Sequence, residues 1–163
     1  MPDNLLQIYH ININCTDLGR TVSFYELIGF QISTDLRVPV ADHPVEFSDI
    51  GLGPPLGLPD DLAGAAVLMS AGSDPRGTKL DIIQWNHPLH EGKQRVSMAQ
   101  PGVGRIALKV KNAQAVFDDL VVAGHQPISE PTRVILGGVP LIFFCVEDPN
   151  GTVIEIMQFA IKK

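Results

Sequence analysis

The two halves of this 163-residue chain repeat one order of sequence patterns. Landmarks for a strand start, a helix cap and a helix end keep the same offset of 95 residues between the halves. These paired landmarks are His10 and Arg105, Asp17 and Asn112, and Gly29 and Gly124. A later pair, Asp81 and Glu155, lies only 74 residues apart, because the first half carries an extra 21 residues before it. Such a repeat predicts two copies of one structural unit.

Each copy begins with a strand pattern and continues with a helix pattern. Ile11 and Ile13 alternate with His10, Asn12 and Asn14, which is typical of a strand with one apolar and one polar face. The strands are predicted at 8–14, 30–33, 65–70, 79–85, 105–111, 141–146 and 152–159, and helical stripes follow Thr16 or Asp17 and Asn112.

We therefore predict an α+β fold with two strand-helix-strand-strand-strand (βαβββ) modules. The first module covers residues 6–86, a crossing loop covers 87–102, and the second module covers 103–160. A four-stranded sheet with one helix leaves one sheet face uncovered. The two modules are therefore expected to form a cupped mixed sheet around a central cleft.

An insertion over residues 35–62 distinguishes the first module from the second. Within it, the Gly- and Pro-rich segment Gly51–Pro59 is predicted to be a loop, and neither a helix nor a central strand. Because this segment is also apolar, we expect it to pack over another part of the protein. Together with residues 86–101, it is expected to form a rim or lid of the cleft.

Strand alternation assigns a face to each residue. The apolar positions expected to face the helices are Ile11, Ile13, Ile82, Ile106, Leu108, Ile154 and Ile156. The alternate positions expected to face the cleft are His10, Asn12, Asp81, Arg105, Glu155 and Met157. Glu155 is the strongest functional candidate, because an acid inside the apolar segment Val153–Phe159 is not explained by packing.

Composition restricts the classes of partner. The net charge is −6, from 12 Lys and Arg against 18 Asp and Glu. A chain with this acidic balance lacks the excess of basic residues expected of a nucleic-acid-binding protein. No apolar run is long enough to span a membrane, and Met1–Gln7 lacks the pattern of a signal peptide. The two cysteines, Cys15 and Cys145, are too few for a disulfide framework, so we expect reduced thiols and a cytoplasmic location.

Several segments resemble the vicinal oxygen chelate superfamily, which includes glyoxalase I, bleomycin-resistance proteins, methylmalonyl-CoA epimerase and extradiol dioxygenases. The similar segments are His10–Asn14, Asp17–Leu18, Phe24–Phe30, Gly104–Val110 and Glu147–Ile156. The last segment is the most specific, because it joins a turn to an inward-facing glutamate. The resemblance implies one glyoxalase-like domain over residues 1–163, a small-molecule ligand and a homodimer.

The resemblance also implies four metal-ligand positions, which are His10, Asp81, Arg105 and Glu155 in this sequence. His10, Asp81 and Glu155 offer one imidazole and two carboxylates, which suit Zn, Ni, Mn or Fe. Arg105 departs from the pattern, because a guanidinium has no lone pair to donate. On this interpretation the protein is a metal-dependent lyase or isomerase that stabilises an enediolate-like anion.

The leading interpretation is that the Arg105 guanidinium replaces the metal cation, so that no cofactor is needed. Arg105 would pair with Asp81 and Glu155, whose burial requires a compensating charge. Glu155 and His10 are then the candidate catalytic residues, and Asn12, Arg105, Trp85 and Met157 the candidate substrate-binding residues. The predicted function is to bind or transform a small oxygenated metabolite, as a lyase, isomerase or dioxygenase. The alternative is a drug- or metabolite-sequestering protein without turnover.

Overall fold

The computed structural model describes residues 5–37, 47, 51–72, 76–90, 92, 98–99 and 101–159. The chain divides into two compact units, Met1–Gly92 and Lys93–Lys163. Parts of the predicted insertion and of the predicted crossing loop lie outside the described residues. The predicted module boundaries, the shared cleft and its lids stay predictions.

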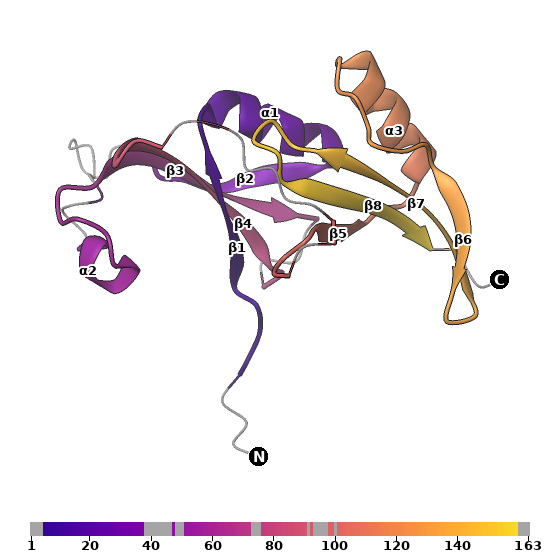
Figure 1. Cartoon of the computed structure of the whole chain (residues 1–163), viewed down its shortest axis with the longest axis horizontal. Helices are drawn as coiled ribbons and strands as arrows, with labels where there is room; N and C mark the ends of the chain where they lie inside the picture. The colour runs from indigo at the N-terminus through magenta and orange to yellow at the C-terminus, as the bar shows by residue number, and fades with distance from the viewer. Residues whose placement is uncertain are drawn as a thin grey trace. The chain divides into compact units, whose positions relative to one another are not determined.

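Unit 1 contains a four-stranded mixed sheet, one long helix and one short helix (Figure 1). Its elements are β1 (His10–Cys15), α1 (Leu18–Ile28), β2 (Phe30–Asp35), α2 (Gly53–Leu56), β3 (Ala63–Ala71) and β4 (Lys79–His87). The strand order is β1-β4-β3-β2, in which β1 and β4 are parallel and the other neighbours are antiparallel.

Unit 2 repeats this arrangement, with a single helix among its described residues. Its elements are β5 (Ile106–Lys109), α3 (Ala113–Val122), β6 (Thr132–Leu136), β7 (Val139–Glu147) and β8 (Val153–Phe159). The order β5-β8-β7-β6 again has one parallel pair, β5 with β8. The α+β class and the two βαβββ modules predicted from the repeat are therefore confirmed.

The long helices begin at the predicted side-chain caps. Of the two candidates for α1, Asp17 is the cap, and its Oδ1 accepts the Arg20 backbone N–H at 2.9 Å. In α3 the Asn112 Oδ1 accepts the Ala115 N–H at 3.1 Å. Helix α1 ends at Gly29, whose φ of 108° favours glycine because other residues are strained there.

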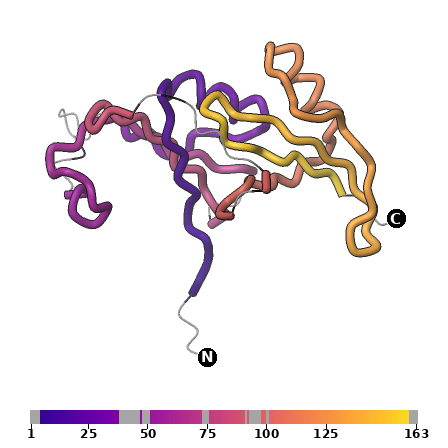
Figure 2. Tube along the Cα trace, in the orientation of Figure 1, coloured from indigo at the N-terminus to yellow at the C-terminus, as the bar shows by residue number. Residues whose placement is uncertain are grey.

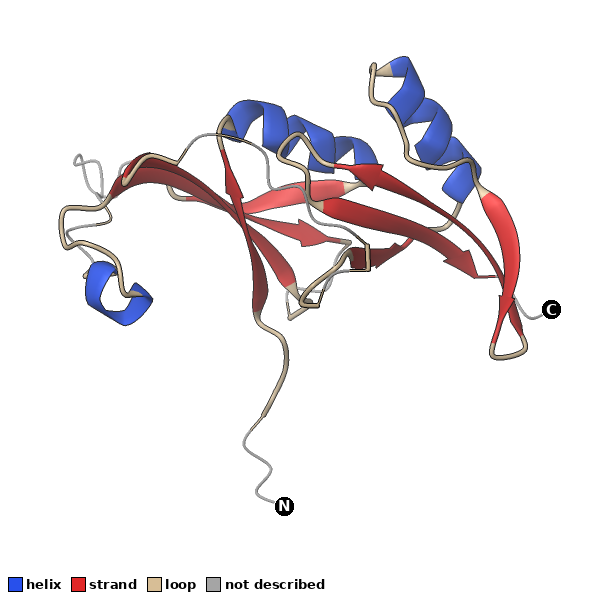
Figure 3. Cartoon of the chain, viewed as in Figure 1, coloured by secondary structure: helices blue, strands red, loops and turns tan. Residues whose placement is uncertain are grey.

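The prediction that Gly51–Pro59 holds no helix is wrong, because α2 lies within this segment. The two prolines, Pro54 and Pro55, fall in the first turn of α2, where backbone N–H groups have no helical partner. Proline therefore loses no hydrogen bond at these positions. Figure 3 shows α2 on the other side of the first sheet from α1.

The largest differences from the predicted strands of unit 2 are in β6 and β5. Strand β6 lies over Thr132–Leu136, where no strand is predicted, and Gly137–Gly138 joins it to β7 (Figure 2). Strand β5 is shorter than the predicted 105–111, so Arg105 lies one residue before it.

Each long helix packs on one face of its own sheet, and the other face is called the open face below. On the helix face of unit 1, Val22, Tyr25 and Ile82 are buried. On the helix face of unit 2, Phe117 meets Phe144 edge to face, with ring centroids 5.3 Å apart. Among the described helices, none has both the length and the apolar character needed to cross a lipid bilayer.

Candidate functional site

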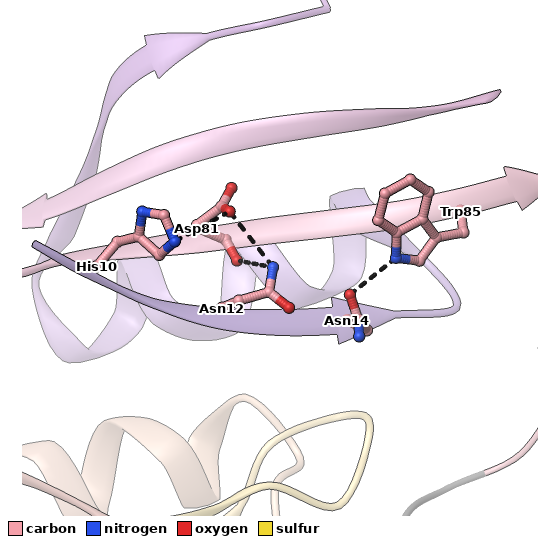
Figure 4. Close-up of polar contacts among 5 residues, drawn as sticks. All are labelled: His10, Asn12, Asn14, Asp81 and Trp85. Carbon is pink, nitrogen blue, oxygen red and sulfur yellow. Dashed lines mark hydrogen bonds and ion pairs between the residues drawn. The ribbon is translucent and has the colours of Figure 1, made fainter. Parts of the chain in front are cut away.

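Three of the predicted site residues meet on the open face of unit 1. His10 and Asn12 come from β1 and Asp81 comes from β4, where Asn12 and Asp81 are directly opposite in the parallel register. His10 Nε2 lies 3.8 Å from Asp81 Oδ2, and Asn12 Nδ2 donates to the Asp81 backbone oxygen at 3.2 Å and to Oδ2 at 3.4 Å. Figure 4 shows the three side chains converging.

The Asp81 side chain is less exposed than that of its neighbour His10. Its side chain is 15% exposed, against 41% for His10. Burial raises the pKa of Asp81, while the nearby His10 and the hydrogen bond from Asn12 act in the opposite direction. A carboxyl group held in this way can accept a hydrogen bond from a ligand, or a proton.

Trp85 lies on the same open face, four residues after Asp81. Its Nε1–H donates to Asn14 Oδ1 at 2.9 Å, as Figure 4 shows, and its ring meets Phe47 edge to face at a centroid distance of 5.3 Å. Asn14, which sequence reasoning did not select, therefore fixes the orientation of the indole. Its place in the polar alternation of β1 is the signal that marks it.

Apolar residues of the insertion cover the Trp85 end of this face. Phe47 and Leu62 are buried against Ala66 and Ile83, and Leu52, Leu58 and Trp85 pack around them. The four residues of this group that come from the insertion, Phe47, Leu52, Leu58 and Leu62, are called the apolar cap. Gly64, opposite Trp85 in the register, allows the close fit, because an added Cβ would lie 2.5 Å from the Gln84 backbone oxygen and 3.0 Å from the Phe47 ring. The expectation that the apolar segment 51–59 packs over another part of the protein is thus met by Leu52 and Leu58.

In unit 2 the central contact joins Arg105 to Glu155. Arg105 Nε donates to Glu155 Oε2. The Glu155 side chain is 8% exposed, whereas that of Arg105 is 47% exposed. The hydrogen bond and the negative charge of Glu155 raise the pKa of Arg105. Arg105 thus neutralises a carboxylate whose burial alone would be costly.

Cys145 lies beside this ion pair, because β7 places it directly opposite Glu155. Burial raises the pKa of the Cys145 thiol, and the charge of Glu155 raises it further, while Arg105 lowers it. Met157 follows Glu155 by two residues on the same open face and is opposite Lys109 and Phe143. Cys145 carries no motif, and only the register of β7 with β8 identifies it.

A glutamine on the last strand of each unit holds the start of the long helix. Gln84 Oε1 accepts the Leu18 N–H at 2.8 Å, and Gln158 Oε1 accepts the Ala113 N–H at 2.8 Å. Both glutamines come three residues after the candidate acid of their strand, Asp81 or Glu155. This shared spacing is the signal that could have identified them. Each acid-bearing strand is therefore fastened to the helix behind it.

The donor set does not fit the four-ligand metal centre that the resemblance implies. His10 and Asp81 offer two ligands in unit 1, whereas Glu155 Oε2 in unit 2 is engaged by Arg105. Arginine cannot be a ligand, since it carries no lone pair for a metal. Within the described parts of the chain, no three His, Cys, Asp or Glu side chains form a group that could hold a metal ion.

Comparisons with known proteins agree with this architecture. The chain is 25% identical over 160 residues to mitochondrial methylmalonyl-CoA epimerase of Homo sapiens, covering 95% of this chain and 75% of that protein. A glyoxalase family protein from Bacillus cereus has a similar fold, with a TM-score of 0.74, 17% identity and 98% of each chain covered. Glyoxalase I of Leishmania major gives a TM-score of 0.60 at 17% identity, covering 94% of this chain and 87% of that one.

The sequence also matches a family description over nearly its whole length. Residues 7–156 match the profile of the Glyoxalase/Bleomycin resistance protein/Dioxygenase superfamily. This range includes the first βαβββ module, the second module up to the middle of β8, and every candidate site residue except Met157. The chain therefore belongs to the Glyoxalase/Bleomycin resistance protein/Dioxygenase superfamily.

Proposed function

We propose that this protein binds a small, oxygen-bearing anionic metabolite through Arg105 and transforms it with Glu155. In this proposal the Arg105 guanidinium takes the place of the metal cation that the resemblance implies. The observation that carries the proposal is the hydrogen bond from Arg105 Nε to the buried Glu155 carboxylate. It supplies a cation at a position that the resemblance assigns to a metal ligand.

Arg105 retains the means to hold a ligand while it pairs with Glu155. A guanidinium has five N–H donors, and Glu155 engages the Nε–H. Because the Arg105 side chain is 47% exposed, the other donors are accessible to a carboxylate or carbonyl oxygen. Planar donors of this kind match such oxygens in pairs, which favours an anionic ligand over a neutral one.

The proposed chemistry is proton transfer next to a carbonyl group. Glu155 takes a proton from the carbon beside the carbonyl, and the electron pair of that C–H bond moves to the carbonyl oxygen. Arg105 donates hydrogen bonds to the resulting oxyanion, as an oxyanion hole does. Return of the proton to the same or a neighbouring carbon completes an isomerisation, and no electrons are gained or lost.

Unit 1, taken by itself, carries groups that suit an oxygen-bearing ligand with an apolar part. His10, Asn12 and Asp81 can exchange hydrogen bonds with hydroxyl or carbonyl oxygens. Trp85, half-buried beside the apolar cap, offers a rigid apolar surface. We propose Asn12 and Trp85 as ligand-contacting residues of unit 1, and Met157 as one of unit 2, each on the open face of its own sheet.

A binding experiment can test the Arg105 contact with two related acids. Phenylglyoxylate and pyruvate share a 2-oxo carboxylate and differ in their apolar part. Isothermal titration calorimetry measures both affinities in the protein and in each variant. We expect Arg105→Gln to weaken both acids by about 10- to 100-fold, because hydrogen bonds to charged groups contribute about 1.5–3 kcal/mol.

A matched control separates this contact from general charge effects. Arg20→Gln removes one exposed positive charge from α1, outside the proposed site, and should leave both affinities unchanged. Equal losses in the two variants would show that the acids respond to net charge alone, and the Arg105 site would be rejected.

The requirement for metal is tested by adding Zn, Ni, Mn or Fe to dialysed protein. A metal that binds only the folded state raises its melting temperature. We expect no rise for the protein as it is, and a rise for Arg105→His, which restores a ligand to the fourth position. A rise of several degrees without the substitution would favour the metal-dependent lyase or isomerase that uses His10, Asp81 and Glu155.

A second candidate function is epimerisation of an acyl-CoA, which the similarity to methylmalonyl-CoA epimerase favours. An epimerase run in D₂O exchanges the proton at the carbon it inverts. Incorporation of deuterium from solvent into methylmalonyl-CoA, lost in Glu155→Gln, would support this function. A ligand that binds tightly and is recovered without deuterium would support sequestration instead.

A further inference from the structure

A small groove lies in unit 2 at the far side of the sheet from Glu155. It has a volume of about 170 Å³ and is lined by Arg133, Pro140, Leu141, Ile142 and Gln158. Gln158 belongs to the helix face of β8, because its Oε1 accepts the Ala113 N–H of α3. The groove is therefore separate from the Arg105 and Glu155 contact, which lies on the open face.

The strand register sets the shape of this groove. Arg133 of β6, Ile142 of β7 and Gln158 of β8 are directly opposite one another in one row across three strands. Neighbouring strands are about 4.8 Å apart, so the backbones of Arg133 and Gln158 are separated by about 10 Å. Ile142 forms the floor between them, and Pro140 continues it along the same face of β7.

Both polar side chains of the groove are donors. In the part of the chain that the structure describes, Arg133 makes no ion pair, and its side chain is exposed. The Gln158 oxygen is occupied by the Ala113 N–H at 2.8 Å, so its NH₂ group is the part left for a ligand. The lining contains no carboxylate. A cation and an amide donor on either side of an apolar floor are complementary to an anion with a small apolar body.

We propose that this groove is a second binding site, for a short branched-chain monocarboxylate. The carboxylate would accept hydrogen bonds from Arg133 and the Gln158 amide, and the alkyl part would lie on Ile142 and Pro140. The size is appropriate, since a cavity of about 150 Å³ holds a benzene-sized molecule. An acid of five carbons, such as isovalerate, has a comparable volume.

The test is an NMR titration of the whole ¹⁵N-labelled chain with isovalerate and with its neutral isostere isovaleramide. We expect isovalerate to shift the Gln158 side-chain NH₂ signals and the amides around Arg133 and Ile142. Isovaleramide should bind at least about tenfold more weakly, because it lacks the charge that pairs with the guanidinium. Equal affinity for the two compounds, or shifts confined to β5 and the Glu155 region, would overturn the proposal.

Two substitutions address the donors separately. Arg133→Gln should weaken isovalerate by about 10- to 100-fold, while Lys111→Gln, which removes an equal charge from the same unit, should not. Gln158→Glu keeps an oxygen for the Ala113 N–H but places a negative charge in the groove. This variant should stay folded and lose isovalerate binding, and unchanged binding in it would also overturn the proposal.

Discussion

The bond between Gln158 and the first turn of α3 gives a sharp test of how each unit holds its helix. Ala113 is fully buried, and its N–H donates to Gln158 Oε1 at 2.8 Å. Gln158→Leu keeps a side chain of similar size but removes the acceptor. The Ala113 N–H then lies without a partner at a buried helix start.

The expected cost follows from the burial of that donor. Leaving a buried donor unsatisfied costs about 1–3 kcal/mol. With an m value of about 2 kcal/mol/M, the urea midpoint of the transition falls by about 0.5–1.5 M. Gln84→Leu should cost a similar amount in unit 1, because Leu18 is also buried and its N–H makes the same bond at 2.8 Å.

Urea unfolding followed by far-ultraviolet circular dichroism measures these changes. The fluorescence of Trp85 reports unit 1 alone, so it shows whether a change in Gln158 reaches the other unit. Amide hydrogen exchange adds a local readout, because the Ala113 N–H should exchange faster in Gln158→Leu.

Gln114→Leu is the matched control, since Gln114 bonds Asp118 at 2.9 Å on the exposed surface of α3. Such a pair contributes about 0.2–0.5 kcal/mol. Gln158→Glu should recover most of the stability, because its carboxylate can accept the Ala113 N–H. If Gln158→Leu costs no more than the control, or if Gln158→Glu is as unstable as Gln158→Leu, the reasoning is refuted.

Three further outcomes are expected. Gly64→Ala should lower the free energy of unfolding by about 1–3 kcal/mol, because its Cβ would lie 2.5 Å from a backbone oxygen of β4. Gly104→Ala, whose nearest contact would be 3.5 Å away, should lower it much less. Urea unfolding of the two variants compares the losses. Iodoacetamide should alkylate Cys145 faster in Glu155→Gln, since loss of the carboxylate charge lowers the thiol pKa, as peptide mapping by mass spectrometry can measure. Asp81→Asn should raise the melting temperature at neutral pH, because the folded state raises the pKa of Asp81 and so disfavours its charged form. The gain should shrink as the pH falls through that raised pKa, since protonation of Asp81 then stabilises the folded state of the unsubstituted protein. An unchanged or lowered melting temperature at neutral pH would contradict this.

Local sequence patterns are sufficient to predict the elements that neighbouring residues alone determine. Alternation of apolar and polar residues in β1 and β4 placed Asn12 and Asp81 on one face, and the structure has them in contact. The cap at Asn112 and the stop at Gly29 depend only on nearby residues, and both are present.

Local patterns are insufficient where the structure of a segment depends on a residue's position within an element, or on a partner far away in the sequence. The prolines of α2 argue against a helix in general and are tolerated only in its first turn. Strand β6 is a different case, because the pair Gly137–Gly138 after it is a local turn signal, typical of a hairpin, that the predicted strands did not use. Gln84 lies 66 residues from Leu18 along the chain, so no local pattern connects them.

In the candidate site, the sequence predicts that Arg105 pairs with both Asp81 and Glu155. The structure pairs Arg105 with Glu155 in unit 2, while Asp81 meets His10 in unit 1. The burial of Glu155 explains why a cation is needed beside it, but only the fold decides that Arg105 is the residue that reaches it.

The matching glutamines make the two long helices equivalent parts. Each helix begins with a side-chain cap of its own and is held to its sheet by a glutamine acceptor on the strand. Segments 17–29 and 112–124 have equal length and begin with an interchangeable Asp or Asn cap. A chimera that carries segment 17–29 in place of 112–124 would bring its own N–H donor to Gln158. Both sheets thus bind the start of a helix through the same hydrogen bond, and exchange of helices between the two units is a route for building new members of this architecture.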